Sequence, residues 1–401
     1  MKLRSKETYW LLKNGIINSY PSLHKDITCD ILIVGGGITG SLIAYQFAQE
    51  GYKTVLLDKR DISTGSTSAT TALLQYEIDE PLNSLIKKVG LAAAIDTYRE
   101  GVNAINKLGT LVRTLEIDCD FGTKKSLFVA QTVQHRKWLE KEFEVRASSG
   151  LNVSWLSESQ LMISYQIRGK GAILSADAAS VDGYKLAHGL LEYAVKYHHL
   201  EIYDHTAVEK VDYDNIKNYA RTEYSNTVTC QYVIYATGYE TQSMLKDKIV
   251  DLVSTYACIC EPLDSIPDHI NDTLVWNTDD PYLYLRSTPD KRILIGGEDE
   301  NFKDAERRDR QIEKKEQRLM AKFKKLIPAM DIIPDFTWAG TFGITKDALP
   351  YIGAHPDYPN SYFVLGFGGN GITFSIMGMD ILSDAIAGRE NKFLHYFRFN
   401  R

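Results

Sequence analysis

The chain is constrained above all by a glycine-rich turn that links a buried strand to a helix near its N-terminus. Residues 29–34 (C-D-I-L-I-V) form a continuous apolar run, which is typical of a buried parallel strand. Residues 35–40 (G-G-G-I-T-G) follow directly, residues 42–48 place apolar side chains at helical spacing, and residues 53–58 predict a second strand. A strand, a glycine turn, a helix and a second strand in this order are the βαβ unit of a dinucleotide-binding site.

Three glycines in the turn have separate tasks in such a site. Gly35 permits the tight turn, Gly37 lets the backbone approach a pyrophosphate, and Gly40 allows the helix to pack closely on the strand. The helix N-terminus offers free N–H groups and the positive end of its dipole to the phosphates. Asp58 ends the second strand, where a carboxylate accepts hydrogen bonds from ribose hydroxyls and repels the extra phosphate of NADP.

Three further segments of small residues favour FAD over NAD as the dinucleotide. Residues 236–238 (A-T-G) end a predicted strand and let a second backbone segment pass close to the cofactor. Residues 65–71 (G-S-T-S-A-T-T) are too small to fill a core, so they form either a flexible loop or a segment pressed against a flat ligand. Residues 366–371 (G-F-G-G-N-G) open a helix whose N-terminal dipole can face the negative charge of a reduced flavin.

Outside this unit the sequence predicts a different architecture. Residues 282–295 alternate in a two-residue period around an S-T-P-D-K turn, which predicts an antiparallel hairpin. Residues 303–326 predict a charged amphipathic helix exposed to solvent, and residues 201–212 predict one strand. Residues 1–28 have the pattern of a polar lead-in, in which Pro21 breaks any helix.

Composition excludes several classes of protein. The 401 residues are 44% hydrophobic and 24% charged, which excludes a disordered chain. Lys and Arg number 46 against 52 Asp and Glu, and the net charge of −6 argues against a nucleic-acid partner. We find no apolar stretch long enough for a membrane span or a signal peptide. Five cysteines without a C-x-x-C pair disfavour disulfides and a zinc site, so we expect a cytoplasmic protein without a metal, of undetermined oligomeric state.

The motifs resemble, in their order, those of the FAD-dependent amine and D-amino-acid oxidase family, which includes glycine oxidase. The pattern is most similar to the gamma-glutamylputrescine oxidase branch, with its Tyr-Trp and Tyr-Pro lead-in at residues 9–10 and 20–21. Beyond the segments quoted above, the matching motifs are L-I-G-G-E-D (residues 294–299), W-A-G-T-F-G-I-T-K-D-A-L-P-Y-I-G (residues 338–353) and G-F-G-G-N-G-I-T (residues 366–373). The resemblance covers nearly the whole chain and specifies the family more than the substrate.

The resemblance implies noncovalent FAD and a set of residues around it. In this family the glycine turn holds the pyrophosphate, Asp58 the ribose and Val208 the adenine side, while the small-residue loop and the C-terminal glycine turn border the flavin. The expected cofactor-binding residues are Gly35, Gly37, Ile38, Thr39, Gly40, Asp58, Lys59, Gly65, Ser66, Thr67, Ala69, Thr70, Thr71, Val208, Ala236, Thr237, Gly238, Gly343, Gly369, Asn370, Gly371, Ile372 and Thr373.

Two departures from relatives refine this expectation. Relatives with covalent flavin carry a histidine in the small-residue loop or a cysteine before the T-x-D stretch, whereas this chain has residues 68–70 (S-A-T) and 340–342 (G-T-F) there. Sarcosine-oxidase-like relatives carry a lysine near the flavin, where this chain has residues 293–295 (I-L-I). The electron acceptor is therefore either oxygen or another compound.

The resemblance also implies the fold class and its division. We expect α/β plus α+β, with a Rossmann-like FAD-binding domain and a second domain built on a mixed, largely antiparallel sheet. Both domains are expected to be discontinuous. Residues 1–80, 180–240 and 341–401 form the FAD-binding domain, and residues 81–179 and 241–340 form the substrate-binding domain.

The predicted hairpin supplies the candidate substrate-binding residues. Alternate residues of a strand share a face, so Tyr282, Tyr284 and Arg286 point the same way. Two aromatic rings and a guanidinium suit a ligand with an apolar stem and a carboxylate, and in amino-acid-oxidising relatives an arginine in this strand binds that carboxylate. The alternative for Arg286 is an ion pair with Asp279, Asp280 or another acid.

The leading hypothesis is an FAD enzyme that oxidises the C–N bond of an amine or amino acid to an imine, which is later hydrolysed. The catalytic residues are undetermined, because hydride transfer from the carbon next to a neutral amine to the flavin needs mainly orientation and exclusion of water. The alternatives are oxidation of a hydroxy acid or glycerol phosphate on the same scaffold, an NAD-dependent dehydrogenase, and a flavin-binding subunit without its own activity.

Overall fold

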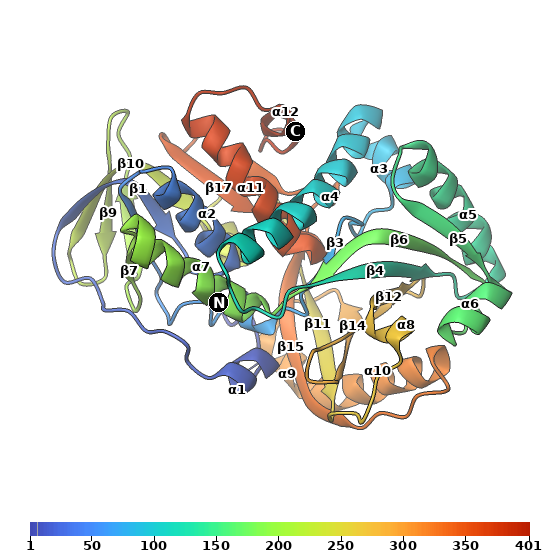
Figure 1. Ribbon diagram of the computed structural model, residues 1–401. Coiled ribbons are helices and arrows are strands. Elements are labelled where there is room, and N and C mark those ends of the chain that lie inside the picture. Colours follow the sequence, from blue (N-terminus) through green and yellow to red (C-terminus); the bar gives the residue numbers. More distant parts are fainter. Residues whose placement is uncertain (6) are drawn as a thin grey trace.

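The computed structural model, which describes residues 1–5 and 7–401, has two β-sheets with helices packed around and between them (Figure 1). The first sheet has eight strands: β1 (Ile27–Val34), β2 (Thr54–Leu57), β7 (Glu201–Tyr203), β8 (Val208–Asp212), β9 (Asn218–Thr222), β10 (Thr227–Tyr235), β16 (Tyr351–Ala354) and β17 (Ser361–Leu365). Their order is β16-β17-β10-β1-β2-β7, with β9 on β10 and β8 on β9. The run from β17 to β7 is parallel, so the buried apolar strands of the predicted βαβ unit lie at its centre.

The second sheet has nine strands: β3 (Leu73–Gln75), β4 (Gly122–Val129), β5 (Val153–Ser157), β6 (Gly171–Ser180), β11 (Asp251–Cys260), β12 (Thr273–Asn277), β13 (Leu283–Ser287), β14 (Ile293–Glu300) and β15 (Pro334–Ile344). Their order is β15-β11-β14-β13-β12-β4-β6-β3, with β5 on β6. Every pairing is antiparallel except β12 with β4. The predicted hairpin is confirmed as β13–β14, and the predicted fold class is confirmed with it.

The longer helices lie against the two sheets. The α-helices are α1 (Tyr9–Asn14), α2 (Ile38–Gln49), α3 (Leu82–Val89), α4 (Leu91–Thr114), α5 (Val133–Ser148), α6 (Glu158–Tyr165), α7 (Gly183–His198), α8 (Asp268–Asn271), α9 (Ala305–Arg310), α10 (Ile312–Leu326), α11 (Gly371–Ile386) and α12 (Lys392–Tyr396). Three short 3₁₀ helices are η1 (Ser66–Ala69), η2 (Gly238–Ser243) and η3 (Gly368–Asn370). In Figure 1, α11 and α4 lie between the two sheets, and α11 packs on both α2 and α4.

The predicted lead-in at residues 1–28 is wrong in one respect. It contains α1, whose Tyr9 and Trp10 are buried at 3% and 1% exposure against Trp338 of β15. Burying one large apolar side chain stabilises a fold by about 1.5–3 kcal/mol, which is enough to hold a short helix to a surface. The N-terminal segment is therefore part of the packed structure.

Two other expectations need correction. The strand predicted at residues 201–212 is divided into β7 and β8. The chain turns between them, and in this turn the Thr206 N–H donates to the Asp58 carbonyl at 2.8 Å. The charged helix at residues 303–326 is divided into α9 and α10, and its face is not fully solvated. Lys315 is 1% exposed, and its Nζ donates to Glu298 Oε2 at 3.2 Å.

The predicted domain boundaries stay a prediction, and they can be compared with the residues that form each of the two sheets. Strands of the first sheet come from residues 27–57, 201–235 and 351–365, and all three lie inside the segments assigned to the FAD-binding domain. β3 lies in the same assigned segments but joins the second sheet, and β15 crosses the expected boundary at residue 340.

Candidate active site

A cavity of about 520 Å³ lies between the two sheets. The glycine turn after β1, the loop after β2 and the A-T-G segment after β10 line one part of it. Residues of β11, β12 and β13, with the glycine turn before α11, line another. Because β1, β2 and β10 are parallel, their carboxyl ends meet at one edge of the first sheet, where ligands of open α/β sheets bind.

The glycine turn has the close approaches that its spacing predicts. Gly35 has φ +109°, and a Cβ there would lie 2.6 Å from the Ala236 carbonyl oxygen. A Cβ on Gly40 would lie 1.8 Å from the Gly35 carbonyl oxygen, so only glycine lets α2 approach the turn. Gly37, at the N-cap of α2, lines the cavity together with Ile38 and Thr39. The open helix N-terminus therefore faces the cavity, as an anion site requires.

Asp58 lines the same part of the cavity and is already bonded to the backbone. Its Oδ2 accepts from the Gly36 N–H at 2.7 Å, and its Oδ1 accepts from the Arg60 N–H at 2.9 Å. Burial raises the pKa of Asp58, while these two N–H groups act in the opposite direction. Each carboxylate oxygen keeps a second lone pair for a ligand hydroxyl, so the geometry is compatible with the predicted ribose contact.

The small-residue loop at residues 65–71 is held in place from several directions. Thr67 Oγ1 accepts from the Ile38 N–H at 2.9 Å, which joins the loop to the start of α2. Two indoles bond its backbone: Trp10 Nε1 donates to the Thr70 carbonyl at 2.6 Å, and Trp338 Nε1 donates to the Ala69 carbonyl at 2.9 Å. The loop therefore has a fixed path along the cavity wall.

Most of the predicted cofactor-binding residues line the cavity, and three do not. The lining residues are Gly35, Gly37, Ile38, Thr39, Asp58, Lys59, Gly65, Ser66, Thr67, Ala69, Thr70, Thr71, Val208, Ala236, Thr237, Gly238, Gly369, Asn370, Gly371 and Ile372. Gly40 acts through packing, as described above. A Cβ on Gly343 would lie 2.3 Å from Val250 Cγ2, and Thr373 Oγ1 donates to the Gln75 carbonyl at 3.2 Å, so both lie behind the wall.

The substrate role predicted for Arg286 does not fit its surroundings. Arg286 is 1% exposed and does not line the cavity. Its Nε donates to the Thr71 carbonyl at 2.7 Å, and its Nη2 donates to the Val181 carbonyl at 3.0 Å. Burial lowers the pKa of Arg286 to about 10, so the guanidinium stays charged at neutral pH. The ion pair with Asp279 or Asp280 is likewise not formed, because the strand carries the side chain toward backbone carbonyls.

Tyr282 and Tyr284 do face the cavity, as the alternation predicted. Their ring centroids lie 5.7 Å apart. Gly296 of β14 stands opposite Tyr284, and a Cβ there would lie 2.2 Å from the Tyr284 ring carbon Cζ. The glycine therefore leaves room for this ring to lie across the sheet surface.

Sequence reasoning missed the residues that complete this end of the cavity. Asp79, Trp276 and Tyr239 all line it. Asp79 Oδ2 accepts from the Gly369 N–H at 2.9 Å, so a carboxylate stands at the turn where we expected only a helix dipole. The surrounding protein raises the pKa of Asp79, although the Gly369 N–H lowers it. No local pattern around Asp79 could have revealed this, since the contact joins segments far apart in the sequence.

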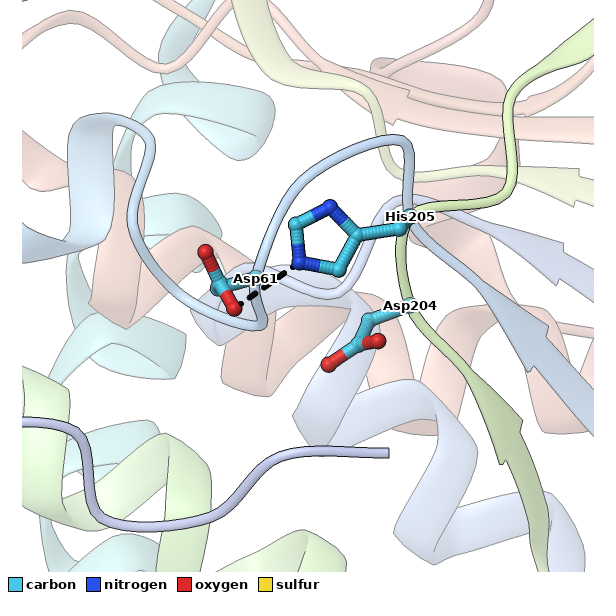
Figure 2. A group of neighbouring side chains, drawn as sticks. All are labelled: Asp61, Asp204 and His205. Carbon is cyan, nitrogen blue, oxygen red and sulfur yellow. Dashed lines mark hydrogen bonds and ion pairs between the residues drawn. The ribbon is translucent and has the colours of Figure 1, made fainter. Parts of the chain in front are cut away.

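A separate ionisable group lies near the loop after β2 (Figure 2). His205 Nε2 and Asp61 Oδ1 are 3.0 Å apart, and Figure 2 shows Asp204 beside this pair. Asp204 Oδ2 accepts from the Tyr20 N–H at 2.9 Å. Ligand atoms of the three residues lie within 4.8 Å of one another. The His205–Asp61 bond ties the loop after β2 to the turn after β7, and the expectation of no metal stays a prediction.

Comparison with known proteins decides the family. The sequence model of the DAO family, which is described as FAD dependent oxidoreductase, matches residues 30–384, most of the chain. The chain belongs to this family. The oxidoreductase therefore takes FAD, and the alternative of an NAD-dependent dehydrogenase is set aside.

Individual relatives are distant but cover nearly the whole oxidoreductase. YhfW of Bacillus subtilis (strain 168), named as a candidate Rieske 2Fe-2S iron-sulfur protein, is 23% identical over 98% of this chain and 75% of its own. Gamma-glutamylputrescine oxidoreductase of Escherichia coli (strain K12) is 24% identical over 93% of this chain and 87% of its own. The crystal structure of glycine oxidase from Geobacillus kaustophilus superposes with a TM-score of 0.75 at 20% identity, over 91% of this chain and 96% of its own. This last likeness shows the fold.

The residues of the cavity fit FAD. The glycines leave space that a Cβ would fill beside the start of α2, and the small-residue loop offers a flat wall without large side chains. Among the described residues, no helix is long and apolar enough to cross a membrane.

Proposed function

We propose that this oxidoreductase oxidises the C–N bond of a small amine or amino acid. The carbon next to the nitrogen loses a hydride to give an iminium ion, and this ion loses a proton from nitrogen to become the imine. Water later hydrolyses the imine to a carbonyl compound and ammonia, or to a carbonyl compound and a free amine when the substrate is a secondary amine. Bound FAD supplies the two-electron acceptor for this oxidation. The observation that carries the proposal is that one cavity is lined both by the dinucleotide-binding turn and by Tyr282 and Tyr284, at the start of β13.

The chain's own residues hold and orient the reactants. Gly35 and Gly37 would hold the pyrophosphate and Asp58 the ribose, while residues 65–71 would lie along the flavin. Tyr284 of β13 and the adjoining Tyr282 line the cavity from the side of the second sheet, where they would exclude water from the reacting carbon. Holding reactants in a fixed orientation is itself a large part of catalysis when hydride transfer needs no acid or base.

The distribution of charge favours an amine over an amino acid, a hydroxy acid or glycerol phosphate. Among described residues that line the cavity, the basic side chains are Lys59, Arg60 and Lys210, which lie in the loop after β2 and on β8. Near Tyr282, the lining residues that the structure describes include the Asp79 carboxylate and no lysine or arginine. A phosphate or carboxylate there would lack the charged donors that recognise it.

Anaerobic reduction of the purified holoenzyme tests the proposal. Candidate amines, amino acids, hydroxy acids and glycerol phosphate are each mixed with oxygen-free enzyme, and the visible absorbance of the flavin is followed. Bleaching by amines or amino acids alone supports C–N oxidation. Bleaching by hydroxy acids or glycerol phosphate alone, or by no compound, overturns it in favour of the corresponding dehydrogenase or a noncatalytic subunit.

A cytoplasmic location is part of the same proposal. All five cysteines are free and buried, which a reducing compartment maintains.

A further inference from the structure

A second cavity of about 330 Å³ adjoins the first, and we call it the side cavity. Asp79, Trp276 and Tyr282 line both cavities, so the two share a wall made of one carboxylate and two aromatic rings. The residues that line the side cavity alone include Trp138 and Asp279. The two cavities therefore meet at Asp79, past which a molecule with one end beside Tyr282 would extend into the side cavity.

The side cavity carries carboxylates without matching cations. Its lining holds Asp79 and Asp279, and none of its described lining residues is a lysine or arginine. Asp279 Oδ2 accepts from Asn277 Nδ2 at 3.0 Å, a neutral donor. His135 lines it as well, with Nδ1 bonded to Thr278 Oγ1 at 2.7 Å. Asp79 is exposed and Asp279 is half-buried, so a cationic ligand in the side cavity can reach both carboxylates and supply the opposite charge.

Aromatic rings form much of the wall of the side cavity, and contacts with their neighbours hold them in place. Trp276 stacks on Phe128 with ring centroids 3.6 Å apart and planes 1° apart. Trp276 Nε1 donates to Ser126 Oγ at 3.1 Å, which fixes the indole plane, and Trp138 packs edge-on against Phe128 at 5.9 Å. Aromatic faces attract ammonium groups and pack against the methylene groups that carry them.

We propose that the side cavity binds a second protonated nitrogen of the substrate, joined by an apolar stem to the nitrogen that is oxidised. The substrate class is then a diamine or longer polyamine. This assignment rests on the proposed C–N oxidation, because it places the reacting nitrogen in the first cavity. The carboxylates of Asp79 and Asp279 attract the second ammonium, and they repel a carboxylate in the same position.

Matched substrates test the assignment with the holoenzyme. Anaerobic flavin reduction is measured with an α,ω-diaminoalkane, the monoamine of equal chain length, and the ω-amino acid of equal length. We expect the diamine to have the highest specificity, by about 10-fold or more over the monoamine, as for a charged hydrogen bond. Equal specificity for diamine and monoamine, or a preference for the ω-amino acid, overturns the assignment.

Asp279→Asn separates the side cavity from the reaction, because Asp279 does not line the first cavity. We expect the variant to raise KM for the diamine about 10-fold with kcat unchanged, and to leave the monoamine unaffected. Asp264→Asn, at an exposed position, is the matched control. An unchanged diamine KM in Asp279→Asn overturns the role of this carboxylate, provided that its circular dichroism matches the parent protein. Trp138→Leu gives a second test, since loss of the ring weakens diamine binding without removing a charge.

Binding of the diamine to the oxidised holoenzyme distinguishes failure of the side-cavity assignment from failure of the proposed C–N oxidation. Calorimetric titration with the diamine needs no turnover. Binding that Asp279→Asn weakens, together with no flavin bleaching, supports the side cavity while overturning C–N oxidation. Bleaching by amines without any preference for the diamine supports C–N oxidation and overturns the side-cavity assignment.

Discussion

Replacement of Arg286 by methionine tests whether this buried guanidinium supports the fold or binds substrate. Its two well-formed hydrogen bonds, at 2.7 Å to the Thr71 carbonyl and 3.0 Å to the Val181 carbonyl, join the small-residue loop to the start of α7. The guanidinium carbon also lies 5.4 Å from the ring centroid of Trp10, which itself bonds that loop. Methionine keeps the apolar stem and removes all of the donors.

The expected cost follows from these contacts. A hydrogen bond from a charged donor contributes about 1.5–3 kcal/mol, so two would contribute about 3–6 kcal/mol if they were independent. Methionine also removes the cost of burying the cation, which offsets part of this loss. We therefore expect Arg286→Met to destabilise the fold by about 2–4 kcal/mol. For a chain of 401 residues that corresponds to a fall in Tm of about 2–5 °C.

Thermal unfolding of the holoenzyme by circular dichroism measures the change. Arg136→Met is the control, because the Arg136 side chain is 48% exposed in an ion pair with Glu140 and such pairs contribute little. We expect KM values for amines without a carboxylate and for amino acids to change by the same factor. An unchanged Tm with KM raised only for carboxylate-bearing substrates would refute the structural role and restore the substrate role for Arg286.

Two further predictions concern the cofactor loop and the response to acid. Trp338→Phe removes the 2.9 Å bond to the Ala69 carbonyl, and we expect a 2- to 10-fold rise in the FAD Kd, about 0.5–1.5 kcal/mol, measured by flavin fluorescence titration of the apoprotein. Trp155→Phe is the control, and an equal rise in both variants would contradict a specific effect on the loop. His188 is 1% exposed, and burial lowers its pKa from 6.5 to about 4, so the folded state resists the proton that the unfolded state takes up below pH 6.5. We expect the free energy of unfolding to be independent of His188 above pH 6.5 and to fall by about 3 kcal/mol as the pH falls toward 4. In a plot of the free energy of unfolding against pH, His188→Gln should flatten this decline, whereas the control His24→Gln should leave it unchanged.

The parts of the fold that depend on local pattern could be predicted from the sequence. Residues 29–34 and 35–40 have the apolar run and the glycine spacing that a buried parallel strand and its phosphate turn require. The structure forms both, with the strand beginning two residues earlier, at Ile27. The hairpin at residues 282–295 follows in the same way from its two-residue period. These elements can be predicted because the residues that determine each of them are close together in the sequence.

Arg286 and Asp79 show where local pattern ends. Alternation places Arg286 on the same strand face as Tyr284, but the loop that runs beside that strand decides whether the guanidinium meets a cavity or two carbonyls. Asp79 had no signal, because its bond to Gly369 joins segments 290 residues apart. The burial of Tyr9 and Trp10 likewise depends on β15, at the far end of the chain.

The sequence by itself determined the family, the cofactor and the turn that would hold it, because glycine spacing and strand pattern are properties of short segments. Only the tertiary structure decided what surrounds the substrate. In the folded chain Arg286 donates to backbone carbonyls and does not reach the cavity. Two carboxylates and several aromatic rings from distant segments line a second cavity. The physical reason is that the charge of a binding site is the sum over side chains from distant segments, and packing alone determines which of them reach the same space.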